Sequence, residues 1–252
     1  MALRLRRAAA VAVWAVPLAL LALLIAVPQI ELDLTTWFFD PVRRVFPWRT
    51  APLGEFVRKG LPLGLFALAG LVALLGGLAA LRRRPLLGVG PRVALYLLVA
   101  LALGPGLVVN LGFKDHWGRP RPSTLAEFHG PNHYVRPLIP SDQCDDNCSF
   151  PSGHAALGFW AIAFALLAPS RRRPAAVAAA VGFGALIGAV RIAQGAHFLS
   201  DVIASGLLVG VVCRIMYYWL LERPVLRSGG GSTPPGPAPL PTPVSPPDKT
   251  SS

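Results

Sequence analysis

Six long apolar runs constrain the fold of this chain more than any other feature. They cover residues 8–28, 61–81, 93–112, 155–169, 174–190 and 202–221. A helix needs roughly 20 apolar residues to cross a bilayer, and most of these runs are that long. Only 14% of the residues are charged, whereas a soluble domain carries about a quarter. The pattern therefore predicts an all-α integral membrane bundle of six transmembrane helices rather than a soluble helical bundle.

Two of the apolar runs differ from the other four. The run at 155–169 is the shortest, and we expect its helix to extend back toward Ser152 and His154. The run at 8–28 follows basic residues, as a signal peptide does, but Pro28 stands where a small-residue cleavage site would be expected. We therefore expect an uncleaved first helix, a membrane domain over 1–227, and a disordered Pro-, Gly- and Ser-rich tail over 228–252.

The basic residues in short turns predict the orientation. With six alternating helices, the N-terminal arginines, the turn at 82–84 and the turn at 171–173 share one side. Short loops rich in Lys and Arg remain in the cytoplasm. Both termini are therefore expected in the cytoplasm, and the longer loops at 29–60 and 113–153 on the outer side.

Three short motifs at the helix ends would meet on that outer side. The first contains Lys114 and, after six residues, Arg121-Pro122; the second is Pro151-Ser152-Gly153-His154; the third contains Arg191, His197 and Asp201. Cations, two histidines and one carboxylate are the groups needed to bind a phosphoryl group and transfer it. Because the motifs adjoin apolar runs, we expect the substrate to be a lipid.

His197 and Asp201 are the candidate nucleophile and its partner. They are four residues apart, so they share a face if they lie on one helix. The carboxylate would then accept the Nδ1 proton and leave Nε2 free to attack phosphorus. The alternative is a histidine at a helix start that a nearby acid caps.

His154 is the candidate general acid. Ser152 and Gly153 precede the fourth run, so their amides can face an anion at the start of a helix, and glycine permits a close approach. His154 would then protonate the leaving alkoxide. Taken alone, this motif is equally typical of a capped helix start with a buried histidine.

Three cations complete the expected site. Lys114, Arg121 and Arg191 could surround the nonbridging oxygens, the arginines with forked contacts. Such a set can replace a metal in stabilising the transition state, so neither a metal nor a cofactor is expected. Arg119 competes with Arg121 for this role because Arg-Pro occurs twice in succession.

The net charge of +12 does not indicate a nucleic-acid partner, because the arginines are dispersed over helix ends. The first outer loop interleaves aromatic and basic residues, which suits the headgroup region. It could form a lipid entrance or only a surface anchor. Cys144 and Cys148 could form a disulfide in an oxidising compartment or, with His129 and His133, a zinc site.

The three motifs, in this order and spacing, resemble the signature of the type 2 phosphatidic acid phosphatases. The resemblance spans the third to the sixth run and implies a metal-independent reaction through a phosphohistidine. It implies His197 as nucleophile, Asp201 as its partner and His154 as acid. Phosphate binding would fall to the remaining motif residues, Lys114, Arg121, Ser152, Gly153 and Arg191. Val190 departs from the small residue that often precedes the third-motif arginine, at a position without a chemical role.

A finer resemblance covers residues 104–110, 114–122 and 144–150, which look like the bacterial lipid A phosphatases of this superfamily, especially the 4′-phosphatases. It implies an inner-membrane enzyme with a periplasmic site that removes a phosphate monoester from lipid A. Other lipid phosphates or diphosphates stay open, namely undecaprenyl diphosphate, phosphatidylglycerophosphate, phosphatidic acid and the lipid A 1-phosphate. A lipid phosphotransferase or a non-catalytic lipid-binding membrane protein are further alternatives.

Overall fold

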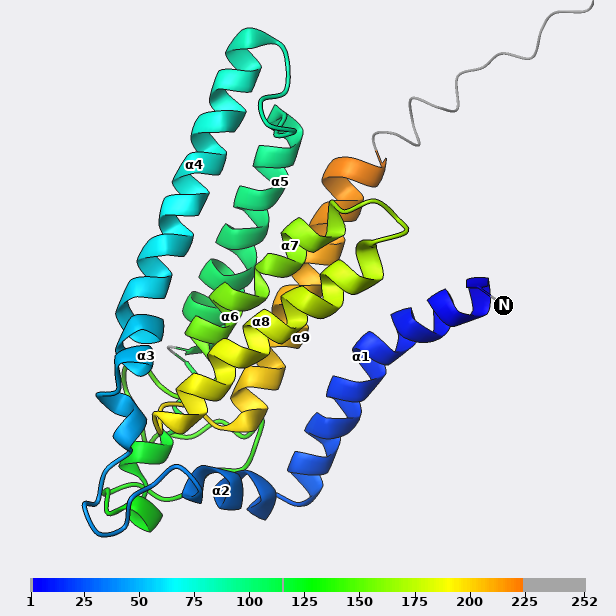
Figure 1. Cartoon of the computed structure of the whole chain (residues 1–252). Coiled ribbons are helices and arrows are strands. Elements are labelled where there is room, and N and C mark those ends of the chain that lie inside the picture. Colours follow the sequence, from blue (N-terminus) through cyan, green and yellow to red (C-terminus); the bar gives the residue numbers. More distant parts are fainter. Residues whose placement is uncertain (1, 115, 224–252) are drawn as a thin grey trace, which may run out of the picture.

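The structure, a computed structural model, describes residues 2–114 and 116–223, with side chains from Trp14 onward. Within these residues the regular structure is helical and no β-sheet forms, which confirms the predicted all-α class. The tail predicted at 228–252 lies outside the described residues. Figure 1 shows long helices side by side, with the irregular loops gathered at one end.

Four helical segments in the described part of the chain are long and apolar enough to cross a membrane. They are Pro52–Arg82, Pro91–Lys114, Arg173–Ala193 and Leu199–Glu222. In order, they comprise α3 (Pro52–Glu55), η2 (Phe56–Gly60) and α4 (Leu61–Arg82); α5 (Pro91–Leu101) and η3 (Ala102–Lys114); α8 (Arg173–Ala193); and α9 (Leu199–Tyr217) with η6 (Tyr218–Glu222). The segments η2, η3 and η6 are π-helical continuations of their neighbours.

The two remaining predicted spans differ from expectation. From Trp14, α1 (Ala2–Ala26) forms a fifth span only together with α2 (Gln29–Thr36), and the pair is bent by 95°. The helices α6 (Gly153–Phe159) and α7 (Ala161–Leu166) together have fewer than 18 residues. At ~1.5 Å per residue they reach at most about 25 Å, less than the ~30 Å of a bilayer core. Length and composition thus support four or five of the six predicted spans.

Small residues allow α8 to pack closely in the middle of the bundle. A Cβ added at Gly184 would lie 2.3 Å from Cδ1 of Phe159 on α6, and one at Gly188 would lie 2.2 Å from Cγ1 of Val202 on α9. Any side chain at these positions would force the helices apart, as in other membrane bundles built on small residues. The second and third motifs sit at the ends of these three helices, so this packing determines how close the motifs lie.

Two buried aromatic side chains join α5 to α6 and α7. Trp160 donates from Nε1 to the carbonyl of Leu97 at 2.9 Å, and Tyr96 donates from its hydroxyl to the carbonyl of Ala163 at 3.1 Å. Buried Trp and Tyr need such partners for their polar atoms. These bonds connect the helix of the first motif to that of the second.

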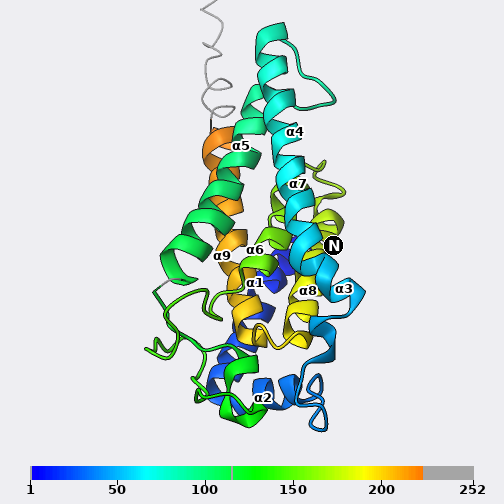
Figure 2. The ribbon, with the colours of Figure 1, turned by 90° about the vertical axis from the view of Figure 1, so that its left-hand side faces the viewer.

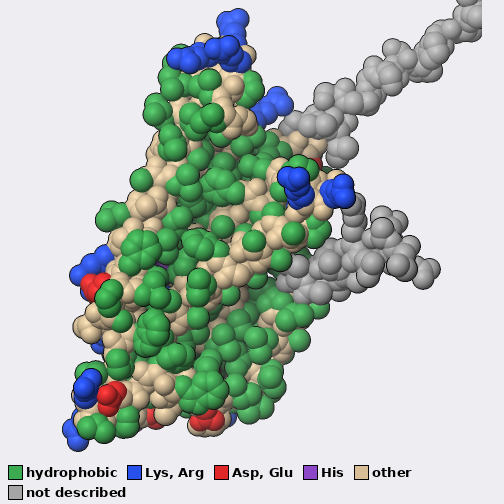
Figure 3. All heavy atoms as spheres, in the orientation of Figure 1, with side chains coloured by type: hydrophobic (Ala, Val, Ile, Leu, Met, Phe, Trp, Pro, Cys, Tyr) green, Lys and Arg blue, Asp and Glu red, His purple; other side chains and the backbone are tan. Residues whose placement is uncertain are grey.

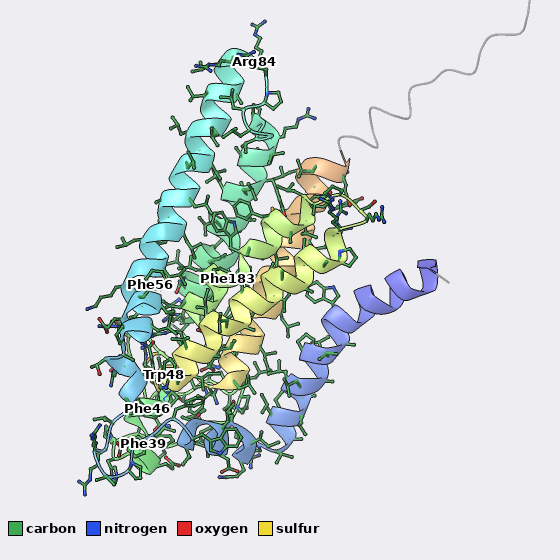
Figure 4. All side chains as sticks on the ribbon, viewed as in Figure 1. Phe39, Phe46, Trp48, Phe56, Arg84 and Phe183 are labelled. Carbon is green, nitrogen blue, oxygen red and sulfur yellow. A yellow bond between two sulfur atoms is a disulfide. The ribbon has the colours of Figure 1, made fainter. Side chains whose placement is uncertain are left out.

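The two ends of the bundle differ in charge and shape. Arg84 lies in the α4–α5 turn at one end, and the turn that holds Arg171–Arg173 lies on the same half (Figure 4). Two views at right angles place residues 29–60 and most of 113–153 at the opposite end (Figures 1 and 2). Hydrophobic side chains cover much of the bundle face between the ends (Figure 3). The separation of basic turns from long loops agrees with the predicted arrangement.

The two long loops share a small core of their own. Phe46 from the first loop and Leu125 and Phe128 from the second are buried together with Phe198. Trp37, by contrast, is 78% exposed. The aromatic residues of the first loop therefore divide between a packed loop core and an exposed surface, and the core holds the first loop over the start of α9.

Candidate active site

The three motifs meet at the loop end of the bundle. Lys114 ends η3, and the Pro151–His154 segment leads into α6. Arg191 lies in the last turn of α8, while His197 precedes α9 and Asp201 lies in its first turn. The structure thus brings together residues that are up to 87 positions apart in the chain, from 114 to 201.

The second and third motifs are hydrogen-bonded to each other. The amide of Ser152 donates to the carbonyl of Asp201 at 3.3 Å. The hydroxyl oxygen of Ser205 lies 3.0 Å from the carbonyl oxygen of Ser152 and 2.8 Å from that of Asp201. The Ser152 side chain caps α6 by accepting from the amide of Ala155 at 3.4 Å. These contacts fix the start of α6 against the start of α9.

Gly153 is needed for a close helix contact. A Cβ at this position would lie 2.7 Å from Oδ1 of Asn110 on η3. Asn110 is itself held by a bond from Nδ2 to the carbonyl of Pro105 at 2.7 Å. The sequence suggested that glycine serves an approach to phosphate; the structure shows in addition that it lets the first-motif helix pass the second motif.

Three cations act on His197. Burial lowers the pKa of His197 well below 6.5, and the positive charges of Lys114, Arg191 and Arg121 lower it further. The first and third motifs therefore surround the imidazole with positive charge. Lys114 and Arg191 are themselves almost fully buried.

His197 has one ring nitrogen bonded and one unpartnered. Nδ1 lies 2.6 Å from the carbonyl oxygen of Ser149. Because a carbonyl only accepts, Nδ1 carries the proton and Nε2 carries the lone pair. Nε2 is buried without a hydrogen-bond partner among the described residues. A buried, unprotonated nitrogen amid cations is suited to attack an anionic phosphoryl group.

Asp201 does not make the predicted hydrogen bond to His197. Its Oδ2 is 3.9 Å from Nδ1, and it accepts instead from the Ser149 hydroxyl at 2.6 Å and the Phe198 amide at 2.8 Å. The prediction assumed that both residues lie on one helix, but α9 begins at Leu199, after His197. Asp201 therefore caps the helix start, and it reaches the histidine through Ser149.

His154 is half-buried at the start of α6. Its Nε2 lies 3.0 Å from the carbonyl oxygen of Arg58 in η2, so Nε2 carries a proton in this arrangement. The motif alone gave no indication of this partner, which comes from the membrane helix that follows the first outer loop.

The two arginines of the repeated Arg-Pro have different environments. Arg121 donates from Nε to the carbonyl of Asn147 at 2.9 Å and lies close enough to His197 to lower its pKa. Arg119 is fully buried and donates from one terminal nitrogen to Asp201 at 2.5 Å and from the other to Glu31. Burial lowers the pKa of Arg119, but the charges of Asp201 and Glu31 outweigh it and raise the pKa.

Glu31 on α2 is a polar residue of this region that the sequence reasoning missed. It is fully buried and accepts from Arg119, from the Ser200 hydroxyl at 2.6 Å and from the Tyr134 hydroxyl at 2.6 Å. The available signal was its position: it is the first charged residue after the run at 8–28. Acids beside membrane segments are seldom without a partner.

Arg191 is held by a second residue that the motifs do not include. Its terminal nitrogen donates to Oε1 of Gln194, and Nε2 of Gln194 donates to the carbonyl of Trp48 at 3.3 Å. The Nε of Arg191 is buried without a partner among the described residues. The first outer loop is thus attached, through Gln194, to a phosphate-binding candidate.

Cys144 and Cys148 form a disulfide, with 5.7 Å between their Cα atoms. The pairing decides between the two predicted alternatives, because bonded sulfurs are not zinc ligands. Asn147, whose carbonyl accepts from Arg121, lies inside the closed loop. The disulfide therefore restrains a partner of the candidate phosphate site.

The family model and the curated proteins that match this chain agree with each other. Residues 93–224 match the PAP2 superfamily model. The chain is 45% identical over 129 residues to a lipid A 4′-phosphatase of Francisella tularensis subsp. novicida, covering 51% of this chain and 58% of the relative. It is 43% identical over 103 residues to one of Rhizobium etli and 40% identical over 107 residues to one of Rhizobium leguminosarum.

These alignments cover 41% and 42% of this chain and 40% and 46% of the Rhizobium proteins, so the chain spans about half the length of the curated relatives it matches. No solved structure matches the chain. The matched region runs from α5 through α9 and contains all three motifs of the candidate site. The chain therefore belongs to the PAP2 superfamily.

Proposed function

We propose that the protein is a membrane phosphatase that removes a phosphate monoester from a lipid, with the 4′-phosphate of lipid A as the favoured substrate. The observation that carries the proposal is the buried, unpartnered Nε2 of His197 among three cations. The names of the relatives support the substrate class, and the apolar helices support a lipid rather than a soluble phosphate ester.

The proposed reaction has two steps. In the first, Nε2 of His197 attacks phosphorus, an N–P bond forms and the bond from phosphorus to the lipid oxygen breaks. His154 gives its proton to the leaving alkoxide. In the second, water attacks phosphorus, His154 takes a proton from that water, and the N–P bond breaks to release phosphate. Because the Arg58 carbonyl occupies Nε2 of His154, we assign the proton transfers to Nδ1.

The cations and the start of α6 would stabilise the charge on phosphorus. Lys114, Arg121 and Arg191 are proposed to contact the nonbridging oxygens, together with Ser152 and Gly153. Asp201 is proposed to hold Ser149, and through it the Nδ1–H tautomer of His197. We propose that these residues act without a metal or a cofactor.

We further propose a six-span topology in the bacterial inner membrane, with residues 1–227 as the membrane domain and the site facing the periplasm. The bent pair α1–α2 would supply the first span, and the short α6–α7 the fourth. Support comes from the basic turns on the half of the bundle away from the motifs (Figure 4). A disulfide beside the site suits an oxidising compartment.

The test is hydrolysis of a panel of phosphorylated lipids by the purified protein with EDTA present. The panel contains lipid A, its two monophosphates, undecaprenyl diphosphate, phosphatidylglycerophosphate and phosphatidic acid. We expect phosphate release from lipid A that survives chelation and is lost in His197→Ala. Transfer of label to a second lipid without free phosphate would indicate a phosphotransferase, and binding without turnover a lipid-binding protein.

A further inference from the structure

A positively charged cavity adjoins the candidate site. It has a volume of about 210 Å³ and lies between the first outer loop and the second. Its walls include Arg44, Arg49, Phe39, Phe46, Phe128 and Ser123. This volume is well above the ~10–15 Å³ that admits one water, so a phosphate group and part of a sugar ring can enter.

The cavity is attached to the phosphate site through the backbone. The residue before Arg49 is Trp48, whose carbonyl accepts from Gln194, the partner of Arg191. On the other wall, the Ser123 amide donates to the carbonyl of Gly195 at 2.9 Å. The cavity therefore borders the segment between Arg191 and His197.

Phe46 forms the wall nearest the site. Gly195 has a φ of +62°, and a Cβ there would lie 2.5 Å from Cδ2 of Phe46. The aromatic ring thus lies directly on the Gly195 backbone, and it packs with Phe39 and Phe128 at centroid distances of 5.2 and 5.3 Å. Figure 4 shows Phe39, Phe46 and Trp48 at the end of the bundle opposite Arg84. Phe46 is buried in this packing, so the aromatic surface left to the cavity comes mainly from the partly buried Phe39, and such a surface suits the apolar face of a sugar ring.

The charge in the cavity is not compensated. No acidic side chain lines it, and within the described residues neither Arg44 nor Arg49 forms an ion pair. Arg43 in the same loop does have a partner, Asp40, at 3.9 Å. Burial lowers the pKa of Arg121, and the charge of Arg49 lowers it further, so Arg49 adds to the positive potential of the site. Such a concentration of positive charge attracts a second anion.

We propose that this cavity binds a second phosphate of the same lipid headgroup while the first phosphate is attacked by His197. The proposal rests on the function proposed above and makes bisphosphorylated lipids the preferred substrates. Arg44 and Arg49 hold the second phosphate, and Phe39, backed by Phe46, faces the sugar that joins the two phosphates. The consequence is a lower KM for a bisphosphorylated glycolipid than for its matching monophosphate.

The test compares two substrates in neutral detergent micelles: lipid A with both phosphates, and the 4′-monophosphate of the same acylation. The variants are Arg49→Gln, Arg44→Gln and, as the matched control, Arg43→Gln. We expect Arg49→Gln to raise the KM for the bisphosphate about tenfold more than for the monophosphate, the loss of one charge-assisted contact. Arg44→Gln should change the same KM ratio in the same direction, and Arg43→Gln should leave the ratio as in the unmodified protein.

The outcomes separate the subsite from the activity itself. If the unmodified protein hydrolyses neither substrate, the proposed function fails. If it hydrolyses both and Arg49→Gln changes the two KM values equally or not at all, the second subsite is refuted while the phosphatase stands. If the Arg49 effect appears only after phosphatidylglycerol is added to the micelles, and then for both substrates, the cavity contacts the anionic membrane surface and the subsite is again refuted.

Discussion

Replacing Glu31 by glutamine tests whether the first outer loop is held to the site by a buried charge network. The substitution preserves shape but removes the negative charge that Arg119 contacts. It also replaces an acceptor of the Ser200 and Tyr134 hydroxyls, both at 2.6 Å, with an amide that can accept at only one atom. Among the residues that the structure describes, Arg119 then keeps one carboxylate partner, Asp201.

The magnitude follows from the burial of the network. Glu31, Arg119 and Asp201 are all fully buried, and removing one partner of such a pair costs about 3–5 kcal/mol. Because Asp201 still compensates Arg119, we expect about 3 kcal/mol, the lower end of the range. For a domain of 150–250 residues, that loss lowers the melting temperature by about 6–12 °C. A shift of Asp201 toward Arg119 would also loosen Ser149, and with it His197, so we expect about a tenfold loss in kcat.

The assay is thermal unfolding in detergent, followed by tryptophan fluorescence, with hydrolysis measured well below the transition. Asp33→Asn is the matched control, since Asp33 lies on the same helix but is exposed, and its side chain is bonded within the described residues only to Gln29. A melting temperature of Glu31→Gln within 2 °C of Asp33→Asn, by the scale of about 2–4 °C per kcal/mol, would refute the reasoning. Arg119→Met removes the cation from both Glu31 and Asp201, so we expect it to cost more stability than Glu31→Gln.

Three further predictions concern the site. Burial and three cations hold the pKa of His197 below 6.5. Its neutral form therefore stabilises the fold above pH 6.5, and this contribution is lost as the pH falls. The melting temperature of the unmodified protein should drop more between pH 7 and pH 5 than that of His197→Gln. Gly153→Ala should cost about 1–3 kcal/mol through overlap with Asn110, partly restored by Asn110→Gly in a double-variant unfolding cycle. Cys148→Ser removes the disulfide that restrains Asn147, whose carbonyl accepts from Arg121, and should lower kcat/KM about threefold to tenfold. Reductant should cause the same loss in the unmodified protein and no further loss in Cys148→Ser.

The fold was predictable to the extent that it depends on local patterns. The apolar runs indicated the long helices because a membrane helix satisfies its own backbone and needs only length and composition. The short α6–α7 pair is different, because it ends at Leu166, three residues before Pro169, and so falls short of the length of a span. Spacing also indicated which residues approach one another, because each motif sits at a helix end on the same side of the bundle.

Hydrogen-bond partners were not predictable in the same way. The four-residue spacing of His197 and Asp201 suggested a direct bond, but that inference depends on where the helix begins, and a start two residues after His197 redirects the carboxylate to Ser149. Glu31 lies 88 residues from Arg119 in the chain. No local pattern selects a partner at that separation; it follows only once α2 lies over the start of α9.

The two arginines of the repeated Arg-Pro have a similar local sequence but different positions in the fold. Both arginines precede a proline, which favours extended backbone, and Arg121 is extended at φ −80° and ψ 151°. In an extended chain, side chains two residues apart point to the same side, so the spacing alone gives Arg119 and Arg121 the same environment. Arg119 enters the core to meet Asp201 and Glu31, while Arg121 remains beside the disulfide loop and His197. The sequence names two candidates for one role, and in the fold the buried carboxylates Glu31 and Asp201 hold Arg119 in the core. Arg121 lies outside that network and beside His197, which supports it as the proposed phosphate ligand.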